Sequence, residues 1–139
     1  MAEKIRDLMT SNPLIVDAED SVVDAARAMR DHDIGAVVVH DGGRVRGLLT
    51  DRDIVVRAVA DGRDPSSATA GELASTDLAT IAPEADPLDA VRLMESRAVR
   101  RLLVVDGGTA VGILTMGDLA VARDPDSALA QVSAAPANA

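Results

Sequence analysis

The chain has 139 residues, a length that fits one ordinary domain or two very small ones. Its 14 basic and 23 acidic residues give a formal net charge of −9, the opposite of the balance that a protein binding nucleic-acid phosphates needs. It contains no cysteine and no Phe, Tyr or Trp, which excludes a disulfide framework, a thiolate nucleophile, a zinc–thiolate site and an aromatic platform for stacked bases.

The first half of the chain predicts the order strand, helix, strand, strand, helix. Pro13 prevents a helix from running through the residues before the first strand. Ser21 is a good N-cap for the first helix, and Thr50 with Asp53 begins the second. An Asp-Gly-Gly turn joins two β-branched runs into a hairpin. These elements are expected at 14–16 (strand), 21–33 (helix), 34–39 and 45–49 (hairpin) and 50–61 (helix).

The second half predicts the same order after a short polar linker, Asp64–Ser67. Asp86 and Pro87 are a favourable N-cap and first helical residue. The elements are expected at 79–81 (strand), from 86 (helix), 101–105 and 111–114 (hairpin) and from 118 (helix). From Asp124 the chain becomes Ala-rich, and the end of the chain is expected to be frayed.

An internal repeat explains why the two halves share one order. Gly47-Leu48-Leu49-Thr50-Asp51-Arg52-Asp53 returns without a gap, 65 residues later, as Gly112-Ile113-Leu114-Thr115-Met116-Gly117-Asp118. A unit of about 60 residues buries little surface alone, so the repeats are expected to share a core. The predicted organisation is a first repeat with its N-terminal segment over 1–63, a linker and second repeat over 64–125, and an Ala-rich, poorly ordered tail over 126–139.

These motifs resemble the tandem pair of CBS domains that is often called a Bateman module, and in particular the stand-alone bacterial pairs without a catalytic domain. The resemblance covers about residues 4–123 and depends mainly on the Gly-x-x-Thr-x-x-Asp closure of both halves. It implies an α+β fold (the α/β-type CBS fold) in which two βαββα repeats pack sheet to sheet about a pseudo-twofold axis. It also implies two clefts between the repeats that bind adenosyl ligands such as AMP, ADP, ATP or S-adenosylmethionine.

The resemblance assigns ligand-binding roles to particular residues. The aspartates of Thr-x-x-Asp would bond the ribose hydroxyls and the threonines would reach ribose or phosphate, which here means Thr50 with Asp53 and Thr115 with Asp118. Basic residues before the second strand would bind phosphate. Only the second half has them, as Arg100 and Arg101, where the first half has Gly35 and Ala36.

The second cleft is therefore expected to prefer a phosphorylated ligand, with Gly35, Thr10 and Ile15 forming its adenine side. A structural alternative stays open for each site residue. Thr-x-x-Asp at the start of a helix is also a capping box, and surface arginines often only pair with carboxylates.

The sequence shows no catalytic motif, no Gly-rich phosphate loop and no pair of histidines at metal-ligand spacing; His32 and His40 stand alone. No catalytic residue, metal site or required cofactor is expected. The first hypothesis is a non-catalytic sensor that binds an adenosyl ligand and acts in trans on a protein effector. The alternative is a ligand-free structural or interaction dimer, and an enzyme ranks below both.

The expected partners are an adenosyl small molecule, a second copy in a homodimer and an unidentified protein effector, with neither nucleic acid nor membrane. Apolar runs have strand length and are far shorter than the ~20 residues of a spanning helix. The N-terminus shows no secretory signal pattern, so a cytoplasmic protein is expected.

Overall fold

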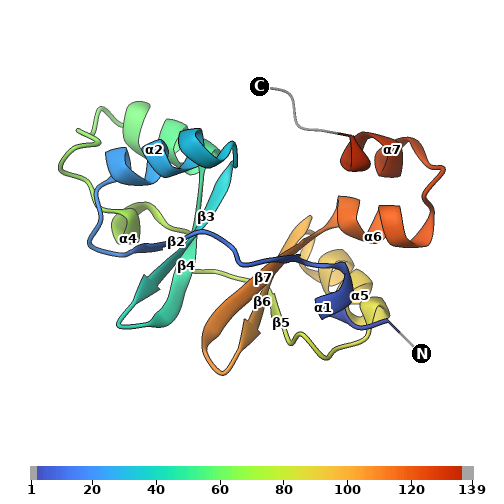
Figure 1. Ribbon diagram of the computed structural model, residues 1–139. Coiled ribbons are helices and arrows are strands. Elements are labelled where there is room, and N and C mark those ends of the chain that lie inside the picture. The colour runs from blue at the N-terminus through green and yellow to red at the C-terminus, as the bar shows by residue number, and fades with distance from the viewer. Residues whose placement is uncertain (1–2, 136–139) are drawn as a thin grey trace. The chain divides into compact units, whose positions relative to one another are not determined.

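The computed structural model, which describes residues 3–135, contains two β-sheets, each with helices of its own (Figure 1). The residues group into two compact units. The first-repeat unit comprises residues 14–78, and the second-repeat unit combines the residues up to Pro13 with those from Ala79 onward. Each repeat shows the predicted order strand, helix, strand, strand, helix.

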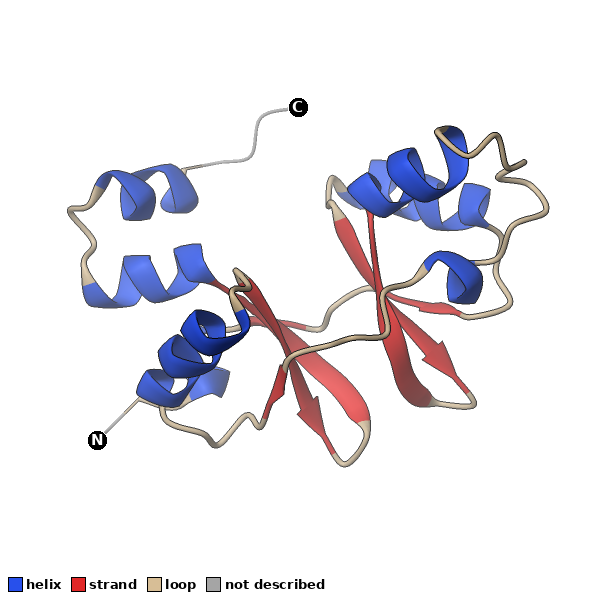
Figure 2. Cartoon of the chain, turned by 180° about the vertical axis from the view of Figure 1, so that it is seen from behind, coloured by secondary structure: helices blue, strands red, loops and turns tan. Residues whose placement is uncertain are grey.

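The sheet of the first-repeat unit has the order β2-β3-β4, formed by Ile15–Asp17, Ala36–Asp41 and Arg44–Thr50. β2 and β3 are parallel because helix α2 (Val22–His32) connects them as a crossover, and β3 and β4 form an antiparallel hairpin. The Ser21 side chain caps α2 by accepting from the backbone N–H of Asp24 at 3.1 Å. The helices lie on one face of the sheet (Figure 2), and the core between them is aliphatic.

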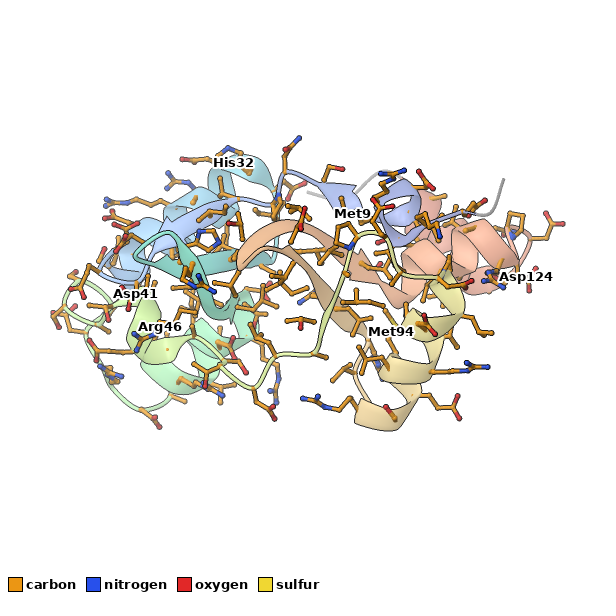
Figure 3. The ribbon with its side chains drawn as sticks, turned by 90° about the horizontal axis from the view of Figure 1, so that it is seen from below. Met9, His32, Asp41, Arg46, Met94 and Asp124 are labelled. Atoms are coloured by element: carbon orange, nitrogen blue, oxygen red, sulfur yellow. The ribbon has the colours of Figure 1, made fainter. Side chains whose placement is uncertain are left out.

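The sheet of the second-repeat unit has the order β1-β7-β6-β5, formed by Thr10–Ser11, Thr109–Thr115, Arg101–Asp106 and Thr80–Ile81. Helix α5 (Pro87–Arg97) is the crossover and begins at the predicted N-cap Asp86. Helix α6 (Met116–Arg123) follows β7. Met94 of α5 is labelled in Figure 3 and belongs to the core of this unit, which also contains Leu102 and Leu114.

The duplication extends to details of the backbone. The hairpin strands shift register after Val39 in one repeat and after Val104 in the other, at the same 65-residue offset. The crossover helices both end in a left-handed residue, Asp33 and Ala98, each with a φ of 53°. Positive φ values in residues other than glycine are uncommon, so their recurrence shows that both repeats end this helix by the same device.

The short helix that precedes each repeat in sequence packs into the core of the other repeat. Helix α1 (Ile5–Leu8) precedes the first repeat in sequence, yet Ile5 is fully buried in the core of the second-repeat unit. Helix α4 (Ala70–Leu73), 65 residues later, packs Leu73 into the core of the first-repeat unit. The predicted boundary between 63 and 64 therefore follows the order of the repeats along the sequence, whereas in space the chain crosses between units near Pro13 and Leu78.

Backbone pairing holds each exchanged segment in place. Thr10 of β1 pairs with Ile113 of β7, and the equivalent residues Ser75 and Leu48 form an isolated antiparallel bridge. Helix α4 is also held at its start by Glu72, which accepts from Thr69. The hydrogen bond from the Arg63 guanidinium lowers the pKa of the Glu72 carboxyl from its ordinary value, and the bonds from Thr69 add to this effect.

Two further elements differ from the sequence prediction, which also did not include α1, α4 and β1. The helix expected over 50–61 is a short α-helix, α3 (Asp51–Ile54), followed by a π-helical turn, η1 (Val55–Val59), which the Ala60 N–H closes by donating to the Val55 carbonyl at 2.9 Å. The Ala-rich tail, for which no regular element was expected, forms helix α7 (Ala128–Ala134) behind an N-cap at Ser127. Residues 136–139 of that tail lie outside the described residues.

No helix within residues 3–135 is long and apolar enough to cross a membrane.

Candidate ligand-binding site

The Thr-x-x-Asp motifs form the same hydrogen-bonded structure in both repeats. The Thr50 N–H donates to Asp53 Oδ2 at 2.9 Å, and the Asp53 N–H donates to Thr50 Oγ1 at 3.1 Å. In the second repeat the Thr115 N–H donates to Asp118 Oδ2 at 2.8 Å, and the Asp118 N–H donates to Thr115 Oγ1 at 3.1 Å. The structural alternative is therefore realised, because each motif is a reciprocal capping box that leaves one carboxylate oxygen outside the box.

The second carboxylate oxygen has different surroundings in the two repeats. Asp53 Oδ1 lies 3.9 Å from Arg57 Nε, and only 16% of the Asp53 side chain is exposed. The residue equivalent to Arg57 in the second repeat is Ala122. Within residues 3–135 Asp118 forms no ion pair, so its second oxygen can accept hydrogen bonds from two ribose hydroxyls without displacing a cation.

The backbone brings the predicted basic residues next to the second motif. Arg101 lies directly opposite Thr115 in the β6–β7 ladder, and the N–H of Met116 donates to the carbonyl of Arg100 at 2.9 Å. Both arginine side chains are exposed, and neither makes an ion pair in the part of the chain that the structure describes. Two uncompensated cations therefore border Thr115 and the start of α6.

The same backbone arrangement in the first repeat carries no positive charge. Ala36 lies opposite Thr50, and the N–H of Asp51 donates to the carbonyl of Gly35 at 2.9 Å. A Cβ atom on Gly35 would lie 3.2 Å from Asp51 Oδ2, so the carboxylate of Asp51 lies next to Gly35. The residue equivalent to Asp51 in the second repeat is the uncharged Met116. Asp51 was not among the predicted site residues, although its place inside the motif was the available signal. A carboxylate there disfavours phosphate by like-charge repulsion.

Thr10 and Ile15 fall in different units. Thr10 pairs with Ile113 two residues before Thr115, and β1 thereby adds a strand at the edge of the second-repeat sheet. Ile15 is exposed and pairs with Val38 two residues after Ala36. Thr10 thus lies in the same unit as Thr115. Gly35 and Ile15 share the first-repeat unit with Asp53, and a cleft between the units stays a prediction.

Among residues 3–135 no three His, Cys, Asp or Glu side chains gather as a group that could hold a metal ion. His32 Nδ1 lies 3.0 Å from the carbonyl oxygen of Ala28, one turn earlier in the same helix.

Comparison with known proteins identifies the duplicated unit. The family model of the CBS domain matches residues 5–59 and 70–124. These two segments are offset by 65 residues and begin at α1 and α4. Each domain in the family sense therefore starts with the short helix that packs into the other unit.

Curated and solved proteins agree with this match. Hypoxic response protein 1 of Mycobacterium tuberculosis is 40% identical over 116 residues, which cover 83% of this chain and 81% of that protein. A crystal structure of Hypoxic Response Protein I with two coordinated zinc ions is 39% identical, with a TM-score of 0.75 over 85% of this chain and 97% of that one.

A hexameric CBS-CP12 protein from bloom-forming cyanobacteria is 25% identical, with a TM-score of 0.72 over 90% of this chain and 72% of that one. These matches confirm the fold class and the family that the repeated motifs predicted. The chain therefore belongs to the CBS-domain family, as a tandem pair of the kind that generally serves regulation.

Proposed function

We propose that the chain is a non-catalytic sensor that binds an adenosyl ligand of the AMP, ADP, ATP or S-adenosylmethionine class and acts in trans on a protein effector. The observation that carries this proposal is the charge difference between two otherwise equivalent motifs. Arg100 and Arg101 border the second motif, where Asp118 has no ion pair to any residue of 3–135, whereas Asp51 and the Asp53–Arg57 pair occupy the first. A duplication that serves structure alone does not require this difference.

The second motif supplies the groups that a nucleoside phosphate needs. A carboxylate oxygen accepts from ribose hydroxyls, and a guanidinium makes charge-assisted bonds to phosphate. The start of α6 adds a positive dipole end. Binding there would stabilise the second-repeat unit and change how it meets an effector, because a ligand shifts a conformational equilibrium by its differential affinity.

Asp118→Ala is expected to weaken AMP binding more than Asp53→Ala, and Arg101→Ala is expected to weaken it as well. Losing a hydrogen bond that involves a charged group costs about 1.5–3 kcal/mol, or about ten- to a hundredfold in affinity. Calorimetry with AMP and adenosine on the three variants measures this. Adenosine binding should respond to Arg101→Ala much less than AMP binding, since adenosine has no phosphate.

The capping boxes require a control. Each Asp→Ala change also removes a cap that contributes about 1 kcal/mol to stability. Asp53→Ala is the matched control, because it removes an equivalent box in the other repeat. Equal losses of affinity in the two aspartate variants, or unchanged AMP binding in Arg101→Ala, would contradict the assignment of the ligand to the second motif.

Self-association is part of the same proposal. Val55, Val56 and Val59 are 58%, 44% and 64% exposed on the last helical segment of the first repeat. Adjacent exposed apolar side chains of this size mark interaction surfaces, and a related CBS protein is hexameric. We expect a homodimer, and light scattering that finds only a 14.4 kDa species at micromolar concentration would contradict it.

These exposed valines also favour the second candidate function, a ligand-free interaction protein. The two candidates differ in one measurable property. A sensor is stabilised by its ligand in a saturable way, by about 2.7 kcal/mol at a hundred times the Kd, and a ligand-free scaffold is not.

A further inference from the structure

The C-terminal helix α7 packs directly against the first turn of α6. A Cβ atom on Gly117 would lie 2.9 Å from Ser133 Cβ and closer still to Ser133 Oγ. Real Cβ atoms essentially never approach so closely, so α7 can occupy this position only because residue 117 is glycine. Figure 1 shows α7 running beside α6. Asp124, labelled in Figure 3, is the C-cap of α6, and the chain turns back after it.

The contact lies within the candidate ligand-binding motif. Gly117 stands between Thr115 and Asp118, and the same Cβ position is 3.6 Å from Thr115 Oγ1. Ser133 therefore lies against the turn that carries Thr115 and Asp118, the residues that a phosphorylated ligand would approach. We propose that α7 is a lid that closes the second-repeat site and must leave α6 before such a ligand binds. This proposal rests on the proposed function.

Glycine at position 117 has a local cost in helix stability, which the contact with α7 offsets. Glycine inside a helix lowers stability by about 0.5–1 kcal/mol relative to alanine. The packing of α7, which this glycine permits, is the gain set against that loss. The first repeat has Arg52 at the equivalent position, and there the chain continues from η1 into the linker without a counterpart of α7. The lid therefore belongs to the repeat that also carries the two arginines.

α7 is weakly attached, as a displaceable lid requires. Ala130 is its one buried residue within the described part of the chain, whereas Leu129 and Val132 are 40% and 74% exposed. An open groove of about 420 Å³ runs along α5 and α6, and α7 contributes Leu129 to its lining. Apolar side chains line most of it: Val91, Met94, Val99, Met116, Leu119 and Leu129. Few buried apolar contacts mean a low free energy of local opening.

The internal bonds of α7 do not depend on α6. Ser127 Oγ accepts from the Ala130 N–H at 3.0 Å, and Gln131 Nε2 donates to the Asp126 carbonyl at 3.3 Å. The lid can therefore leave α6 without losing its own cap. A ligand that binds only the open state has its affinity reduced by the open fraction, so displacing α7 should tighten binding.

Gly117→Ala in the full-length chain tests the lid. The new methyl group expels α7, while alanine favours the α6 helix. Ser133→Gly removes the opposing side chain, so the double variant should let α7 return, and Ser133→Gly alone controls for the added glycine. AMP binding by calorimetry should tighten about tenfold in Gly117→Ala and return toward the wild-type value in the double variant. Hydrogen exchange of 128–134 should accelerate and recover in parallel.

Each result decides the proposal. Faster exchange of α7 in Gly117→Ala with unchanged AMP affinity overturns the lid alone. Unchanged exchange in that variant also overturns it, since the contact would then not hold α7. If no variant binds AMP, the proposed function fails and the lid fails with it.

Discussion

Ile5→Ala should destabilise the second-repeat unit, although the residue precedes the first repeat in sequence. Ile5 is fully buried among Ala90, Met94 and Leu102, and truncating a buried isoleucine to alanine costs about 2–5 kcal/mol. The backbone of α1 is fixed to the same unit, because the N–H of Ile5 donates to the Ala85 carbonyl at 3.1 Å. Residues of the first repeat therefore cannot compensate for the packing that is lost when Ile5 is truncated.

Leu73→Ala is the matched variant, since α4 makes the equivalent contact in the other direction. Leu73 is 2% exposed in the first-repeat core. Urea unfolding measures both losses, and hydrogen exchange locates them. Ile5→Ala should raise exchange in β6 and β7, and Leu73→Ala in β3 and β4. Val132→Ala, at a highly exposed position, should change neither. Faster hydrogen exchange of β3 and β4 in Ile5→Ala would contradict the packing of α1 into the core of the second-repeat unit.

Gly47→Ala should cost more stability than Gly112→Ala, although the two glycines are equivalent in the repeat. A Cβ on Gly47 would lie 2.6 Å from the Ser75 carbonyl oxygen and 3.0 Å from Ala74 Cβ, both parts of fixed structure. A Cβ on Gly112 would lie 3.0 Å from the Thr10 carbonyl oxygen and would otherwise meet the Met9 side chain, which can rotate away. Met9 is labelled in Figure 3.

Overpacking costs about 1–3 kcal/mol, and we expect Gly47→Ala near the upper end and Gly112→Ala near the lower end of that range. The shift of the urea midpoint gives each value, provided that the denaturant slope is unchanged. Gly112→Ala/Met9→Ala should recover part of the smaller loss by removing the flexible obstacle. A loss at Gly112 as large as that at Gly47 would show that the exchanged segments are equally rigid in the two repeats.

The elements with strong local signals could be predicted from the sequence. The N-caps Ser21 and Asp86, the two Asp-Gly-Gly turns and the hairpins stand where the pattern placed them, because turn and capping chemistry is local. The repeated motifs also carried the resemblance to the CBS family, which the family model confirms. Helix α7 was missed because its prediction depended on the periodic spacing of apolar residues. The Ala-rich segment has a high helix propensity but no such spacing.

The packing of α1 and α4 into the core of the other repeat could not be predicted, because it depends on tertiary contacts and not on local sequence. Nothing in residues 5–8 says which core the helix enters, and the assignment became visible only through the burial of Ile5 and the pairing of Thr10 with Ile113. At the candidate site, the family resemblance pointed to Thr115, Asp118 and Arg101, and their ligand-binding role stays a prediction. The sequence did not show that the neighbouring Gly117 is in contact with Ser133, since that contact joins segments 16 residues apart.

Titration calorimetry of the wild-type chain with AMP tests the central claim most directly. We expect saturable binding that Asp118→Ala and Arg101→Ala weaken and Asp53→Ala largely preserves, together with a rise in the unfolding temperature that grows with AMP concentration. The same chain should be tested with ADP, ATP and S-adenosylmethionine, since the proposal names the adenosyl class and not the member. Absence of both heat and thermal stabilisation with all four compounds would contradict the sensor and leave the ligand-free interaction protein.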